Sequence, residues 1–167
     1  FDSEKNYSSG STMGRYDNYT PQYVDAIADA VSRLKDHYRP ETIILTGHSG
    51  GAAITGIIIG RHPELVDSAV LAACPCDIDQ WRSGLGKRLC QKSLSPNDVI
   101  TYIDRKTKVL ALVGSKDDNT FPLLSQNYIQ KLKTRGLQAE YKLLPGITHD
   151  EVAQSLDLVV SIRELLQ

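Results

Sequence analysis

The sequence TIILTGHSGG, residues 42–51, decides the fold of this chain. Residues 42–46 are β-branched or apolar at successive positions, which is typical of a strand covered on both faces. Gly47 ends this strand, and the Ala- and Gly-rich run from Gly50 to Arg61 predicts a helix that packs closely on a sheet. Strand, tight turn and helix in direct succession indicate a parallel α/β architecture.

The same alternation continues on both sides of this unit. Continuous apolar runs predict three more buried strands, and apolar residues with helical spacing predict three more helices. The expected strands are residues 68–74, 108–113 and 137–144, and the expected helices are residues 21–39, 121–135 and 152–166. Right-handed crossovers between such strands give one parallel sheet with helices on both faces. Residues 1–167 are therefore expected to form a single α/β domain.

Two segments carry no such pattern. Residues 1–19 are rich in Ser, Asn, Asp, Gly and Tyr, and they are interpreted as an irregular opening loop. Residues 76–107 are mixed and polar and contain Trp81, the only tryptophan. We expect one or two short helices there, for example around residues 96–105, and a small cap segment over the site.

Composition narrows the classes of function. Hydrophobic residues make up 41% of the chain, and the formal net charge is −1. The mixed charges exclude the basic surface that binds nucleic acid or an anionic membrane. The longest apolar runs fall far short of the roughly 20 residues that cross a bilayer. No signal peptide is visible, which favours the cytoplasm, although a mature secreted chain would look the same.

The three cysteines are Cys74, Cys76 and Cys90. They form no C-x-x-C pair and no cluster of metal ligands, so no metal is expected. Buried free thiols are the usual state in a domain with an apolar core. A disulfide between Cys76 and Cys90 is the alternative in an oxidising compartment.

The motif G-H-S-G-G lies between a predicted strand and a predicted helix, which is the context that G-x-S-x-G requires. The turn is strained, so Gly47 and Gly51 are expected at positions with no room for a side chain. The Ser49 hydroxyl is then expected to point away from the turn with no side chain beside it. Ser49 would begin a helix, where unpaired amides favour negative charge, and the Gly50 N–H is the expected first donor to an oxyanion. A glycine-rich turn without catalytic function is the alternative.

A serine nucleophile needs a base and a group that orients the base. Asp117 and His149 each follow a separate predicted strand, so both should reach the rim of the sheet where Ser49 lies. Taken alone, Asp117 is explained as a turn former and His149 as a loop residue that caps the last helix. The order Ser, Asp, His behind three parallel strands favours a catalytic triad.

The remaining three histidines and Asn119 are the other polar residues for which the sequence suggests a role. His48, within the turn, and Asn119, after Asp117, are candidate substrate contacts. His37 and His62 lie at predicted helix ends and are interpreted as structural.

These motifs resemble the α/β-hydrolase superfamily. GHSGG matches the nucleophile elbow, GSKDDNTFP at residues 114–122 matches the acid loop, and PGITH at residues 145–149 matches the histidine loop. The resemblance covers the chain from about residue 20 to its end. In prolyl-oligopeptidase-like hydrolases the acid loop often reads D-D-[NR] with the first carboxylate in the triad, which implies Asp117 rather than Asp118.

The resemblance also implies a part of the fold that this sequence lacks. Family members carry several strands ahead of the elbow, and a loop after the third of them supplies the second oxyanion donor. The expected architecture is therefore an α/β-hydrolase fold without its N-terminal strands. Because half a sheet exposes the edge of a central strand, we expect a second chain or segment to supply this part and complete the pocket.

The expected reaction is two-step acyl transfer on a small ester or amide, with no metal and no organic cofactor. A serine esterase acting on carboxylic esters is the first hypothesis. A serine peptidase or amidase of the prolyl-oligopeptidase-like type is the nearest alternative. A catalytically silent binding module on the same fold is the third.

Overall fold

The computed structural model describes residues 19–89 and 92–166. Its sheet contains four parallel strands in the order β1-β2-β3-β4. The strands are β1 (Ile44–His48), β2 (Ser68–Ala72), β3 (Lys108–Gly114) and β4 (Ala139–Leu144). The helices are α1 (Pro21–Tyr38), α2 (Gly50–Arg61), α3 (Ile78–Gly84), α4 (Pro122–Thr134) and α5 (Leu156–Glu164), with two 3-10 helices, η1 (Pro96–Tyr102) and η2 (Glu151–Gln154). The predicted parallel α/β fold is confirmed.

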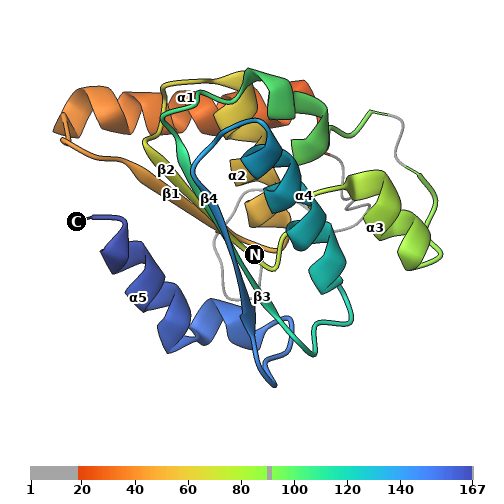
Figure 1. Cartoon of the computed structure of the whole chain (residues 1–167). Coiled ribbons are helices and arrows are strands. Elements are labelled where there is room, and N and C mark those ends of the chain that lie inside the picture. The colour runs from red at the N-terminus through yellow and green to blue at the C-terminus, as the bar shows by residue number, and fades with distance from the viewer. Residues whose placement is uncertain (1–18, 90–91, 167) are drawn as a thin grey trace, which may run out of the picture.

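Helices cover both faces of the sheet, because residues of β2 and β3 point alternately into two apolar clusters. On one face, Leu71 and Ala111 pack in a cluster with residues of α2 and α4. On the other face, Val70 and Leu112 pack with Leu158 of α5. Figure 1 shows α2 and α4 on one side of the sheet and α5 on the other.

Two expectations about the elements were wrong. β1 is not covered on both faces, because Thr46 is exposed and the other residues of the strand are only partly buried. β1 is also an edge strand of the described sheet. The last helix is not continuous either. Ser155 has extended backbone angles and accepts a hydrogen bond from the Leu158 N–H at 3.2 Å, so it ends η2 and caps α5.

The first helix begins as predicted, and it is tied to the end of α2. Thr20 caps α1 through a hydrogen bond from the Tyr23 N–H. Asp25 of α1 accepts two hydrogen bonds from Arg61, at 2.9 and 2.7 Å, and its Oδ1 lies 2.8 Å from Nε2 of His62. The hydrogen bonds from Arg61 are the main reason that the pKa of Asp25 falls to about 2.

The state of the cysteines differs from both sequence interpretations. Cys74 and Cys76 form a disulfide after the end of β2, with Cα atoms 5.2 Å apart. This separation lies within the usual range for a disulfide, and it leaves Cys76 unable to pair with Cys90. Cys90 lies outside the described residues, as do residues 1–18 of the expected opening loop.

Residues 76–107 contain α3 and η1, and η1 lies where a short helix was expected around residues 96–105. The role of this segment as a cap over the site stays a prediction. Within the described ranges, no helix is both long enough and apolar enough to span a bilayer.

Candidate active site

Ser49 occupies a strained turn between β1 and α2. Its φ of 55° and ψ of −120° lie outside the common regions for a residue with a side chain. Such a conformation costs on the order of 1–3 kcal/mol and persists only where neighbours hold it. Here the Ser49 N–H donates to the Ala72 carbonyl at 2.9 Å, and its own carbonyl accepts from the Ala52 N–H at 2.9 Å. The backbone has the strain expected of a nucleophile elbow.

The glycines around Ser49 differ in how much space they have. A Cβ on Gly47 would lie 2.2 Å from the carbonyl oxygen of Gly51, so no side chain fits there. Gly51 was also expected to have no room for a side chain. This expectation was wrong, since a Cβ there would meet no described atom within 4 Å and the position faces solvent. Gly50 is restricted instead: a Cβ would lie 2.8 Å from the hydroxyl of Tyr19. The sequence alone had not indicated this contact with Tyr19.

Ser49, His149 and Asp117 form a continuous chain of hydrogen bonds. Nε2 of His149 lies 2.9 Å from Oγ of Ser49. Nδ1 of the same ring lies 2.9 Å from Oδ2 of Asp117. The three residues come from the loops that follow β1, β4 and β3, at the carboxyl ends of the strands (Figure 1). The structure therefore brings together the three residues named from the sequence.

The carboxylate of Asp117 is held by the loop that follows it. Oδ1 accepts hydrogen bonds from the N–H groups of Asn119 at 3.0 Å and Thr120 at 2.8 Å. The Thr120 hydroxyl lies 2.8 Å from Oδ2 and 3.1 Å from Nδ1 of His149. Asp118 is exposed. Sequence reasoning missed Thr120, although an Asp that binds the N–H groups two and three residues ahead is a known turn pattern.

The surroundings shift both ionisable groups toward their charged forms. The hydrogen bond to Asp117 is the largest influence on His149 and raises the pKa of the imidazole above its ordinary value, against the opposing effect of burial. For Asp117, burial is the largest influence and acts to raise the pKa. Hydrogen bonds from His149 and Thr120 outweigh it, and the pKa of Asp117 falls below its ordinary value. The carboxylate therefore stays ionised although its side chain is fully buried.

The two candidate substrate contacts already have partners within the protein. His48 Nε2 lies 2.9 Å from the backbone carbonyl oxygen of His149. The carbonyl and the side-chain oxygen of Asn119 accept from the indole N–H of Trp81, at 3.1 and 3.3 Å. Both residues thus support the loops of the site, and contact with substrate stays a prediction. The Gly50 N–H begins α2, where the amides of the first turn have no acceptor within the helix.

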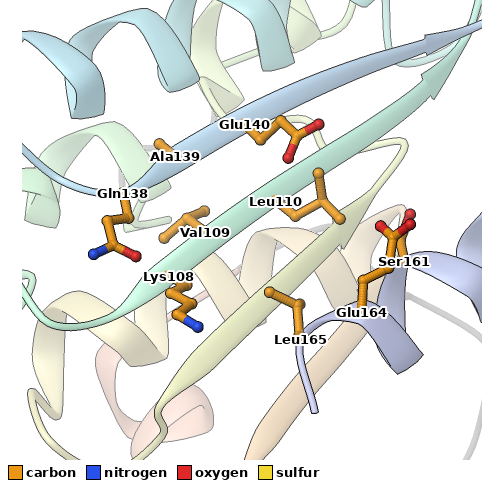
Figure 2. A pocket seen from close by; sticks show the side chains of 9 residues that line it. All are labelled: Lys108, Val109, Leu110, Gln138, Ala139, Glu140, Ser161, Glu164 and Leu165. Carbon is orange, nitrogen blue, oxygen red and sulfur yellow. The ribbon is translucent and has the colours of Figure 1, made fainter. Parts of the chain in front are cut away.

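A separate hollow lies at the opposite end of the sheet. It has a volume of about 390 Å³ and is lined by residues that start β3 and β4 and by residues of α5 (Figure 2). Lys108 and Ala139 begin these strands, whereas Asp117 and His149 follow their ends. This hollow is therefore not the space beside Ser49.

The parallel sheet, with Ser49, His149 and Asp117 joined in one hydrogen-bonded chain at the carboxyl ends of its strands, has an α/β-hydrolase fold. Residues 9–164 match the prolyl oligopeptidase family, and the chain belongs to this family. The resemblance drawn from the motifs is confirmed. A comparison with curated proteins found no match.

Solved structures share the fold at low sequence identity. Esterase PE8 superposes with a TM-score of 0.63 and 19% identity, over 87% of this chain and 59% of the esterase. A truncated carbohydrate esterase from gut microbiota superposes with a TM-score of 0.71 and 15% identity, over 88% of this chain and 68% of the esterase. Porphyromonas gingivalis dipeptidyl peptidase 4 superposes with a TM-score of 0.67 and 16% identity, over 81% of this chain and 20% of the peptidase. The chain thus spans less than two thirds of esterase PE8, and the likeness is one of fold.

Proposed function

We propose that this chain carries the catalytic triad of a serine hydrolase that cleaves carboxylic esters through an acyl-enzyme on Ser49. The observation that supports it most is the pair of 2.9 Å contacts that link Ser49, His149 and Asp117. A serine hydroxyl is a weak nucleophile at neutral pH, and a base within hydrogen-bond reach is what activates it.

In the proposed first step, Nε2 of His149 takes the Ser49 proton while Oγ bonds to the carbonyl carbon of the ester. The imidazolium that forms is stabilised by the ionised carboxylate of Asp117. The tetrahedral intermediate then expels the alcohol, which leaves with the proton from His149. In the second step, His149 takes a proton from water as the water oxygen bonds to the acyl carbon. The bond from that carbon to Oγ of Ser49 then breaks, the acid departs, and Oγ takes the proton from His149.

The Gly50 N–H is the proposed first donor to the oxyanion of both intermediates. It follows the nucleophile directly and lies at the N-terminus of α2, where the helix dipole favours negative charge. Loss of one such donor costs about 3–4 kcal/mol in related chemistry. A Cβ at residue 50 would lie 2.8 Å from the Tyr19 hydroxyl, so a side chain there would require the Tyr19 side chain to shift.

Two observations bear on the substrate. Similarity of fold to esterase PE8 and to a carbohydrate esterase supports ester hydrolysis. Membership of the prolyl oligopeptidase family and the D-D-N acid loop support a peptidase or amidase, which is the second candidate. Both reactions use the same triad, so the substrate must be decided by turnover.

Labelling with a fluorophosphonate probe tests the nucleophile. The complete native protein should be modified at Ser49, and a Ser49→Ala variant should not be modified. Lack of labelling in the complete, folded protein would reject the proposed hydrolase and favour a binding module.

Turnover of nitrophenyl esters against aminoacyl nitroanilides then separates the two substrates. The ester proposal predicts the larger kcat/KM for the esters relative to each compound's uncatalysed rate. A larger acceleration of the anilides, abolished by Ser49→Ala, would assign the protein to the peptidases.

A further inference from the structure

A second cluster of side chains lies around the catalytic histidine. His48, His149 and Asp150 each offer one ligand atom, and these atoms lie within 4.8 Å of one another. Imidazole nitrogen and carboxylate oxygen are ligands that Zn²⁺ binds readily, at about 2.0–2.2 Å. We propose that these three residues form a site for a divalent transition-metal ion such as Zn²⁺, and that the bound ion inhibits the hydrolase.

The hydrogen bonds of the two histidines determine which nitrogen of each neutral ring carries the lone pair. A backbone carbonyl can only accept, so the contact between His48 Nε2 and the His149 carbonyl oxygen places a proton on Nε2. The neutral His48 ring then keeps a lone pair on Nδ1. In His149, Nδ1 donates to Asp117 and the lone pair is on Nε2. Histidines that bind metal usually donate their other ring N–H to a carbonyl or carboxylate in this way.

The remaining requirement is a small movement. Two ligands of one tetrahedral ion at these bond lengths lie about 3.4 Å apart. The three ligand atoms lie within 4.8 Å of one another, so they have to approach by up to about 1.4 Å. Asp150 is exposed, and its carboxylate receives no cap hydrogen bond from η2, so it has room to turn. The two imidazoles and the carboxylate would supply three ligands, with water as the fourth.

Inhibition follows from the atom that the ion would occupy. Nε2 of His149 is the nitrogen that accepts the Ser49 proton, at 2.9 Å. An ion bound to that lone pair removes the base, and Ser49 can no longer be activated. This consequence depends on the proposed function, whereas binding of the ion does not.

The test measures zinc binding and serine reactivity separately, on the complete native protein stripped of metal. Calorimetry should show one Zn²⁺ bound per chain, and the rate of fluorophosphonate labelling should fall as the site fills and recover with EDTA. Mg²⁺, which prefers oxygen ligands, should neither bind there nor inhibit.

Two matched variants separate coordination from charge. Asp150→Asn should weaken zinc binding by at least about 10- to 100-fold, the loss that removal of an outer-shell partner already causes. Asp150 also raises the pKa of His149 through space, so the metal-free labelling rate is compared at a pH where His149 is neutral, and there it should change by less than about twofold. Asp118→Asn removes the same charge from a carboxylate that also acts on His149 through space, yet Asp118 is not in the cluster. Zinc affinity should therefore be unchanged in Asp118→Asn.

Equal zinc affinity in Asp150→Asn and the wild type, or equal weakening by both variants, would overturn the proposed site. If the metal-free protein is not labelled at all, the proposed hydrolase fails, and calorimetry alone still decides whether the zinc site exists.

Discussion

At the scale of single residues, the site depends on a carboxylate that stays charged without contact with water. The side chain of Asp117 has no exposed surface, and burial alone would favour its neutral form. The N–H groups of Asn119 and Thr120 and the Thr120 hydroxyl compensate with three hydrogen bonds at 2.8–3.0 Å. This arrangement keeps the imidazole of His149 oriented toward Ser49.

The raised pKa of His149 leads to a prediction on pH dependence. The base must be neutral, so kcat/KM should rise with pH through a midpoint above the ordinary histidine pKa. The contribution of this pKa shift to the stability of the fold changes in the opposite direction, because it decreases as pH rises. A raised pKa stabilises the folded state below the pKa of the unfolded chain, and this contribution is lost as pH rises through the folded value.

A pH-rate profile of the complete protein measures this midpoint. Removing the nearby charge in Asp118→Asn should move the midpoint to lower pH. A midpoint below the ordinary histidine value in the wild type would contradict the assignment of His149 as base.

The two neighbouring aspartates should differ in their effect on the rate. Asp117→Ala removes the partner of His149 Nδ1, and kcat is expected to fall by about 10³- to 10⁴-fold, as in other triads. Asp118→Ala removes an exposed carboxylate and should cost less than about tenfold. Steady-state kinetics at a pH above the His149 midpoint compares them. The reverse order of effects would show that the family pattern was carried over wrongly.

At the scale of elements, the packing of α1 on α2 includes an ion pair that can be tested alone. Asp25 pairs with Arg61 in two hydrogen bonds and lies beside His62, whereas Asp29 pairs with Arg33 within α1. The pair of Asp25 and Arg61 is partly exposed and the pair of Asp29 and Arg33 is largely exposed, so solvent screening reduces the contribution of both to stability, and more strongly for the second.

We expect Asp25→Asn to lower the free energy of unfolding by about 1 kcal/mol and Asp29→Asn by less than about 0.5 kcal/mol. Urea unfolding of the complete native protein at neutral pH measures both variants. The pKa of Asp25 is lowered to about 2, so its contribution is present above the ordinary aspartate pKa and is lost only as pH falls toward about 2. Equal losses in the two variants would mean that the link between helices adds nothing.

At the scale of the whole molecule, β1 has a neighbour on one side only among the described strands. An edge strand presents unpaired N–H and C=O groups to any other strand. On α1, Tyr23, Leu34 and Tyr38 are 53%, 56% and 72% exposed. We propose that strands from a second chain or segment pair with β1 and complete the pocket beside Ser49.

The polypeptide of 167 residues, purified alone, should therefore self-associate or fail to fold cooperatively. Light scattering and native mass spectrometry report its state, and hydrogen exchange reports the protection of the β1 amides. A folded monomer of 18.5 kDa would contradict the proposal.

The sequence by itself determined the features that depend on neighbours along the chain. Apolar runs and helical spacing predicted all four described strands and helices α1, α2 and α4, with ends that differ by a few residues. The motif around Ser49 predicted the strained turn, because strand, bare Gly47 and helix are local requirements. The order of Ser, Asp and His behind parallel strands indicated the three loops of the site, and the resemblance to prolyl-oligopeptidase-like hydrolases implied Asp117 rather than Asp118.

Only the tertiary structure decided what depends on residues distant in sequence. Thr120 contacts His149, which lies 29 positions further along the chain, and Tyr19, just before α1, lies beside Gly50. No local pattern in the sequence predicts these contacts. The exposure of β1 likewise follows from which strands lie side by side. The disulfide between Cys74 and Cys76 joins residues only two positions apart, and the cysteine pattern did not predict it. Hydrogen bonds and burial are properties of surfaces that meet, and the packing of the whole fold sets which surfaces those are.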